Sequence, residues 1–108
     1  MLRMLKVDRW DPQKGQFNEE NARAAFKPAY CYRIFLREME EAAAFTGDAE
    51  ERTLVVLDGS FTLQAPGGRK TLVPGDIAQV PAGEFVFEST GPVSFLAVYK
   101  LPPELWPN

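Results

Sequence analysis

The sequence predicts an all-β domain, because short apolar segments alternate with glycine- and proline-containing turns through most of the chain. The segments are rich in β-branched and aromatic residues, which favour strands over helices. Many short strands at near-regular spacing are typical of a β-sandwich or a β-barrel. We predict strands over residues 30–38, 53–57, 60–64, 70–73, 77–80, 85–88 and 93–100.

With 108 residues the chain is long enough for one domain. We divide it into an N-terminal arm with a short helix (1–29), a barrel (30–100) and a proline-rich tail (101–108). Asn18 is the predicted N-cap of a helix that runs to Phe26, and Pro28 disfavours a helical residue before it. Residues 38–45 have helical propensity but form too short a segment, so we expect a loop or a distorted strand there.

The turns are marked by glycine and proline. Asp58-Gly59 predicts a two-residue β-hairpin between the strands at 53–57 and 60–64, because both central positions of such a turn need positive φ. Pro66-Gly67-Gly68, Pro74-Gly75-Asp76, Pro81-Ala82-Gly83 and Gly91-Pro92 predict the following turns.

Composition excludes several classes of function. The net charge is −3 and no cluster of lysine and arginine exists, so no nucleic-acid partner is expected. The apolar runs are too short to cross a bilayer, and the N-terminus becomes polar too early for a signal peptide. Cys31 is the single cysteine and cannot form an internal disulfide, which fits a cytoplasmic protein. We expect Cys31 to be a buried strand residue.

The segments GDIAQVPAG at 75–83 and VVLDGSF at 55–61 resemble the cupin superfamily, in particular its small single-domain members of uncharacterised function. The resemblance covers roughly residues 30–100 and implies a jelly-roll barrel, the double-stranded β-helix. Gly75, Pro81 and Gly83 match the second cupin motif in register, and Gly59 matches the glycine that ends the first motif.

The positions at which the resemblance implies metal ligands do not carry them here. The histidine of the second motif falls on Val86, the glutamate of the first motif on Arg52, and its two histidines on Asp48 and Thr46; the chain contains no histidine at all. Valine cannot ligate a metal, and a protonated arginine repels one. We therefore predict no transition metal and no cofactor. A site for a hard cation made of carboxylates alone stays open as an alternative. Its candidate ligands are Asp48, Glu50, Glu51, Glu84 and Glu88.

Strand alternation extends the resemblance to neighbouring residues. If Val86 faces the barrel interior, Glu84 and Glu88 face it too, and Phe85 and Phe87 face outward. Arg52 shares a face with Leu54 and Val56 by the same rule. We hypothesise that Arg52 and Glu88 form an ion pair inside the barrel mouth, the alternative being that Arg52 extends to solvent. The predicted pocket residues are Thr46, Asp48, Arg52, Gln79, Val86 and Glu88.

Three functions follow from these predictions. The preferred one is a metal-free module that binds a small, anionic molecule in the barrel. The second is an interaction protein that acts as a homodimer, with Phe85, Phe87, Trp10 and Trp106 as apolar surface. The third is an enzyme, either a carboxylate-ligated metalloenzyme or one resembling metal-independent sugar-nucleotide epimerases, with Glu84 or Glu88 as the base. No catalytic residue is assigned.

Overall fold

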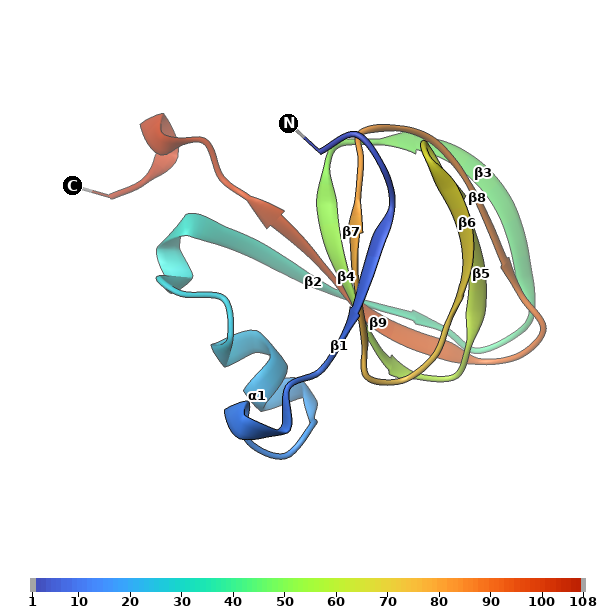
Figure 1. Cartoon of the computed structure of the whole chain (residues 1–108), viewed down its shortest axis with the longest axis horizontal. Coiled ribbons are helices and arrows are strands. Elements are labelled where there is room, and N and C mark those ends of the chain that lie inside the picture. Colours follow the sequence, from blue (N-terminus) through green and yellow to red (C-terminus); the bar gives the residue numbers. More distant parts are fainter. Residues whose placement is uncertain (1, 108) are drawn as a thin grey trace.

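The computed structural model describes residues 2–107, which form nine strands in two antiparallel sheets (Figure 1). The five-stranded sheet has the order β1-β7-β4-β9-β2 and the four-stranded sheet the order β3-β8-β5-β6. In chain order the strands are β1 (Lys6–Arg9), β2 (Tyr32–Met39), β3 (Ala43–Ala49), β4 (Arg52–Asp58), β5 (Phe61–Ala65), β6 (Gly68–Leu72), β7 (Asp76–Val80), β8 (Gly83–Ser89) and β9 (Val93–Lys100). The predicted all-β jelly-roll architecture is confirmed.

The chain changes sheet at almost every connection, as a jelly roll requires. Within residues 2–107, β5 and β6 are the consecutive strands that pair, with Ala65 opposite Gly68 across the two-residue turn Pro66-Gly67. The hairpin predicted at Asp58-Gly59 is wrong, because β4 and β5 lie in different sheets.

Gly59 nevertheless has the positive φ that the motif indicated, 73°, whereas Asp58 does not. A Cβ at Gly59 would lie 2.1 Å from the Pro92 carbonyl oxygen, so the glycine is needed where the chain passes from one sheet to the other. The two-residue signal was correct about the positive φ of Gly59, but wrong about that of Asp58 and about the pairing of the two strands that the turn connects.

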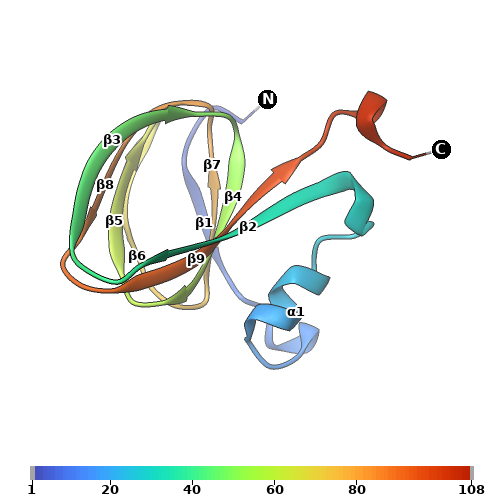
Figure 2. The ribbon, with the colours of Figure 1, turned by 180° about the vertical axis from the view of Figure 1, so that it is seen from behind.

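The N-terminal arm covers the outer face of the five-stranded sheet (Figure 2). Helix α1 (Glu19–Ala24) begins after Asn18, whose side chain accepts a hydrogen bond from the Asn21 amide at 2.7 Å. Ala22 of this helix is fully buried against Val55 and Leu96. The predicted helix is therefore present, although it ends two residues before Phe26.

Three short 3-10 helices complete the connections. They are η1 (Pro12–Lys14), η2 (Ala29–Cys31) and η3 (Pro103–Leu105). The segment 38–45, expected to be a loop or a distorted strand, contains the end of β2, a turn and the start of β3. No helix among residues 2–107 is long and apolar enough to span a membrane.

The main hydrophobic core lies between the two sheets. The side chains at its centre are aliphatic and aromatic, and they are fully or almost fully buried; among them are Val56, Phe61, Leu63, Leu72, Val80 and Phe87. Burying each such side chain contributes about 1.5–3 kcal/mol to folding. The core therefore supports the barrel from which the candidate site is built.

Candidate functional site

The register of β8 decides which side chains enter the barrel. Phe87 is 2% exposed and packs in the core between the sheets, and Phe85 packs against the same core. Glu84 and Glu88, on the opposite face of the strand, are exposed. The predicted orientation of β8 is therefore wrong: the two phenylalanines point inward and the two glutamates outward.

The physical reason for this error is the two-residue period of a strand. A shift of one residue moves every side chain of β8 to the other face. Burying two phenyl rings stabilises the fold, whereas burying two carboxylates without partners costs free energy. The glycines and prolines of the motif mark where the strand begins, but they do not determine its facing.

Four of the predicted pocket residues lie on the outside of the barrel for the same reason. Strands β3 and β8 pair with Thr46 opposite Val86 and Asp48 opposite Glu84. These side chains border an open hollow on the outer face of the four-stranded sheet. Glu88 is exposed on that face as well. Thr46, Asp48, Val86 and Glu88 therefore do not meet inside the barrel as predicted.

Gln79 also lies outside the barrel, on the outer face of the other sheet. Its neighbours along β7, Ala78 and Val80, are fully buried in the core, and Gln79 itself is exposed. It borders a groove beside Thr53 and Lys100. An amide contact from Gln79 to a molecule inside the barrel is excluded by this orientation.

Arg52 is the predicted site residue that does enter the barrel. It shares the inner face of β4 with Leu54 and Val56, as predicted, and is only 7% exposed. Its Nη1 donates a hydrogen bond to the Glu50 carbonyl oxygen at 3.1 Å, and its guanidinium carbon lies 5.0 Å from the centre of the Phe85 ring.

Neither prediction for the partner of Arg52 is correct. The ion pair with Glu88 does not form, because Glu88 is on the outer face of β8, and Arg52 does not extend to solvent either. Burial lowers the pKa of the Arg52 guanidinium from its usual value, and the nearby Tyr99 opposes this effect. Arginine stays protonated in proteins, so a positive charge stands inside the barrel.

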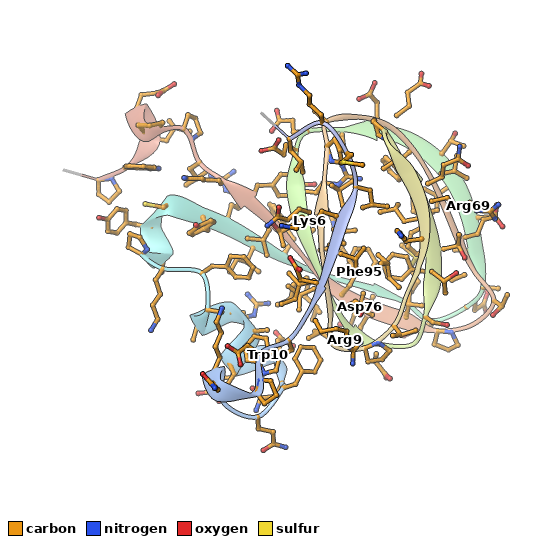
Figure 3. All side chains as sticks on the ribbon, viewed as in Figure 1. Lys6, Arg9, Trp10, Arg69, Asp76 and Phe95 are labelled. Atoms are coloured by element: carbon orange, nitrogen blue, oxygen red, sulfur yellow. The ribbon has the colours of Figure 1, made fainter. Side chains whose placement is uncertain are left out.

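A cavity of about 300 Å³ lies in front of Arg52, between β4, β9 and β2 of one sheet and β5, β8 and β3 of the other. Its walls are mainly aromatic: Phe45, Phe85, Phe87, Phe95 and Tyr99. Figure 3 labels Phe95, which lies inside the barrel. Predominantly apolar walls with a few polar groups are typical of small-molecule sites.

The cavity extends to a seam between two strands that do not pair. Both β2 and β3 are edge strands of their sheets. The side chains nearest the seam on their inner faces are Phe35 and Phe45, which are 38% and 40% exposed. The seam therefore leaves apolar surface exposed beside the cavity.

The charges around the cavity are positive. Arg37 is the second arginine in its wall, and its guanidinium carbon lies 5.3 Å from the centre of the Phe35 ring. The ion pairs found within residues 2–107 are Arg9–Asp76 and Arg23–Glu19, and neither involves Arg37 or Arg52. No aspartate or glutamate side chain borders the cavity. The site therefore suits an anion.

The donors in the cavity wall do not fit the transition metal that the cupin resemblance implies. Imidazole, thiolate and carboxylate ligands are the groups that bind such metals. The cavity wall contains no imidazole, thiolate or carboxylate, and the Arg52 guanidinium lies there instead. Within residues 2–107 no group of three or more histidine, cysteine, aspartate or glutamate side chains could hold a metal ion.

Several residues of the site were missed by sequence reasoning, namely Arg37, Phe45, Phe85, Phe87, Phe95 and Tyr99. The Phe-Val-Phe run at 85–87 carried a usable signal, because two phenyl rings two residues apart belong on one buried face. Phe45 and Arg37 had no such signal, since both lie on edge strands whose residues are largely exposed.

The aromatic residues expected to form a dimer surface pack within the chain instead. Phe85 and Phe87 line the cavity, Trp10 packs against Phe17, and the Trp106 Nε1 donates to the Leu101 carbonyl oxygen. Cys31 is a buried free thiol, as predicted, although it ends η2 one residue before β2.

Comparison with solved structures finds this fold in several proteins. A cupin superfamily protein from Desulfitobacterium hafniense matches with a TM-score of 0.56 and 11% identity, over 92% of this chain and 79% of that one. The cupin-2 domain of an XRE family transcriptional regulator from Enterobacter cloacae matches with a TM-score of 0.56 and 16% identity, over 91% and 97%.

A Streptococcus pyogenes protein of unknown function matches with a TM-score of 0.55 and 11% identity, over 66% of this chain and 65% of that one. No protein-family model and no curated protein matches the sequence. At such low identities the similarity shows the fold and not the activity. The two sheets, the sheet-switching connections and these matches agree with the segments GDIAQVPAG and VVLDGSF: the chain has the cupin fold.

Proposed function

We propose that this protein binds a small anionic molecule in the barrel cavity, with Arg52 as the residue that holds the negative charge. The observation that carries the proposal is the position of Arg52: it is 7% exposed, faces the cavity and has no acidic partner within residues 2–107. A pocket of this size falls at the lower end of the range for small-molecule sites.

The energetics of a buried guanidinium support this proposal. Removing a charge from water costs several kcal/mol unless a partner compensates it. One Arg52 donor is used by the Glu50 carbonyl. No fully buried side-chain nitrogen or oxygen among the described residues lacks a partner, so the remaining Arg52 donors keep some accessible surface. Arg52 borders both the cavity and the groove beside Thr53 and Lys100. A bound carboxylate or phosphate would accept those donors in a charge-assisted pair.

Binding is better supported than catalysis because the carboxylates suggested as general bases are absent from the cavity. The glutamates suggested for that role, Glu84 and Glu88, lie on the outer face of β8. Apart from the two arginines, Tyr99 is the titratable residue of the cavity wall. A tyrosine and two arginines can orient and stabilise an anion, whereas the wall offers no histidine, aspartate or glutamate as a base.

The test is a thermal-unfolding assay with benzoate, hexanoate, citrate and inorganic phosphate. We expect at least one of these anions to raise Tm by several degrees at saturation, because a molecule that binds only the folded state stabilises it. The variant Arg52→Met should lose the response. Arg33→Met, an exposed β2 arginine outside the cavity wall, is the matched control and should keep it. Equal responses of wild type and Arg52→Met would contradict the proposal.

We further propose that two copies associate through the seam. Phe35, Leu36 and Phe45 are 38–40% exposed there, and the unpaired edge of β2 leaves backbone donors and acceptors free. A two-fold pairing of β2 edges would cover both features. Light scattering after gel filtration should then give the mass of a dimer, and Leu36→Lys should shift it to that of a monomer. A monomeric wild-type protein would refute this association.

A further inference from the structure

Three phenyl rings form a continuous stack that ends at the cavity. The Phe61 and Phe87 rings have centres 4.7 Å apart and planes inclined by 27°, and the Phe87 and Phe45 rings have centres 4.9 Å apart and planes inclined by 20°. Phe61 and Phe87 are each 2% exposed, whereas Phe45 is 40% exposed. The stack therefore ends in a ring that has uncovered surface in the cavity wall.

Phe85 connects this terminal ring to the buried charge. Its ring is nearly perpendicular to that of Phe45, with centres 6.1 Å apart, and the Arg52 guanidinium carbon lies 5.0 Å from its centre. The distance from the centre of the Phe45 ring to the Arg52 guanidinium carbon therefore cannot exceed the sum of these two distances. Phe45 and Arg52 both border the cavity, so a single aromatic ring that carries a carboxylate is the kind of ligand that would contact both.

The size and polarity of the cavity narrow the ligand further. A volume of about 300 Å³ holds on the order of ten non-hydrogen atoms at the packing density of a protein interior. The polar side chains in the wall are Arg52, Arg37 and Tyr99. The guanidinium fork matches a planar carboxylate, and the largely aromatic wall favours a ligand with one charged end and an apolar body over inorganic phosphate, which is polar throughout.

We infer that the ligand is a small aromatic carboxylate, with its ring stacked on Phe45 and its carboxylate bound by Arg52. Aromatic pairs contribute about 0.5–1.5 kcal/mol beyond the area they bury, which favours a planar ring over a puckered one of the same size. This inference rests on the proposed function and adds the class of ligand and its orientation.

The experiment titrates the full chain, uniformly labelled with ¹⁵N, with four probes in NMR spectroscopy. They are benzoate, cyclohexanecarboxylate (the same charge on a puckered ring), benzamide (the same ring without charge) and inorganic phosphate. We expect benzoate to shift the amide signals of cavity residues and to bind threefold to tenfold more tightly than cyclohexanecarboxylate. Benzamide should bind at least tenfold more weakly than benzoate, because it lacks the charge-assisted pair with Arg52.

Two matched variants at the seam test whether the benzoate ring stacks on Phe45. Phe45→Leu should weaken benzoate binding threefold to tenfold and leave cyclohexanecarboxylate unchanged, because leucine keeps the apolar surface and loses the stacking face. Phe35→Leu is the control: Phe35 is 38% exposed at the same seam but does not border the cavity, so its replacement should change neither affinity. Both phenylalanines are more than one-third exposed, so neither change threatens folding.

The outcomes separate this inference from the proposed function. Equal binding of benzoate and cyclohexanecarboxylate, or tighter binding of phosphate, at the cavity residues would overturn the aromatic ligand while leaving an anion site in the barrel. Binding of benzoate that is insensitive to Phe45→Leu would overturn its orientation. If no probe shifts the cavity signals, both the ligand class and the anion site are wrong.

Discussion

The interior of the barrel has two halves that differ in how completely they are filled. The packed half lies between β1 and β7 on one sheet and β6 on the other, where Leu5, Leu72, Ala78 and Val80 are at most 5% exposed. The open half lies between β2 and β9 and the facing β3 and β8, and contains the cavity of about 300 Å³. The same two sheets thus build a solid core on one side and a pocket on the other.

The difference arises at the edges of the sheets. On the packed side, the Leu5 amide donates to the Pro66 carbonyl oxygen at 3.1 Å, and a Cβ at Gly67 would lie 2.5 Å from the Met4 Cβ, so the N-terminal segment closes tightly over the β5–β6 turn. The facing edge strands do not pair on either side: β1 and β6 form no ladder on the packed side, and β2 and β3 form none on the open side. The two sides therefore differ in the N-terminal segment that packs over the β5–β6 turn on one side and in the aromatic cavity beside β2 and β3 on the other.

Each half also contains one buried charged residue, and only one of the two has a partner of opposite charge. Asp76 in the packed half is 6% exposed. Its carboxylate accepts a hydrogen bond from the Arg9 Nη1 at 2.7 Å and another from the Val73 amide at 2.9 Å; Figure 3 labels Arg9 and Asp76. Arg52 in the open half has no acidic partner within residues 2–107. The paired Asp76 fits a structural role, and the absence of an acidic partner for Arg52 within residues 2–107 is the basis of the binding that we propose.

The largest expected effect is in the packed half. Leu72→Ala removes a fully buried side chain and should lower the free energy of unfolding by about 2–5 kcal/mol. Met39→Ala, in the wall of the open half, should cost less than half as much, because the cavity already separates it from some neighbours. Urea denaturation measures both. Equal losses would contradict the distinction between the halves.

Loss of the paired charge should rank second. Asp76→Ala removes hydrogen bonds to a charged group and should lower the free energy of unfolding by about 1.5–3 kcal/mol. Asp8→Ala, an exposed residue of the neighbouring strand β1, is the control and should stay within about 0.5 kcal/mol of wild type. If Asp76→Ala leaves the free energy of unfolding unchanged in the same urea titration, the Asp76 charge does not stabilise the fold.

Removing the Arg52 charge should not lower the free energy of unfolding, in contrast to removing the Asp76 charge. Arg52→Met should leave the free energy of unfolding unchanged or raise it by about 1–2 kcal/mol, because a desolvated charge is replaced by an apolar side chain of similar length. The same protein should no longer respond to anions. A destabilisation above about 2 kcal/mol without any ligand effect would show that Arg52 serves the fold and not a ligand.

The smallest change in stability is expected at the end of the aromatic stack. Phe45→Leu should alter the free energy of unfolding by less than about 1 kcal/mol, because the ring is 40% exposed and has little buried area to lose. Phe87→Leu, at 2% exposure in the middle of the stack, should cost more. Similar losses for the two variants would place Phe45 in the core instead of the pocket.

Much of the fold could be predicted from local sequence. Runs of β-branched and aromatic residues located most of the strands, glycine and proline located the turns, and Asn18 marked the start of α1. Strand β1 was not predicted, because its four residues, KVDR, carry little apolar signal and form a strand by pairing with β7. Strand β3 was not among the predicted strands either; residues 38–45 were expected to form a loop or a distorted strand. Within the site, the shared inner face of Arg52, Leu54 and Val56 was predicted correctly.

The remainder of the site could not be predicted, because it depends on which face of each strand meets the other sheet. Motif spacing fixed where β8 begins, but the burial of Phe85 and Phe87 fixed its facing and moved Thr46, Asp48, Val86 and Glu88 to the outside. Arg37 and Phe45 joined the site only through the packing of the two sheets.

The sequence by itself determined the strand and turn pattern, the cupin motifs and the absence of histidine. These properties depend on single residues and their near neighbours along the chain. Only the tertiary structure decided that β4 and β5 lie in different sheets, that the N-terminal segment packs over the β5–β6 turn, and that an arginine faces an aromatic cavity on the other side of the barrel. These properties depend on contacts between residues far apart in the chain, where burial of apolar side chains selects one register among several that local preferences allow.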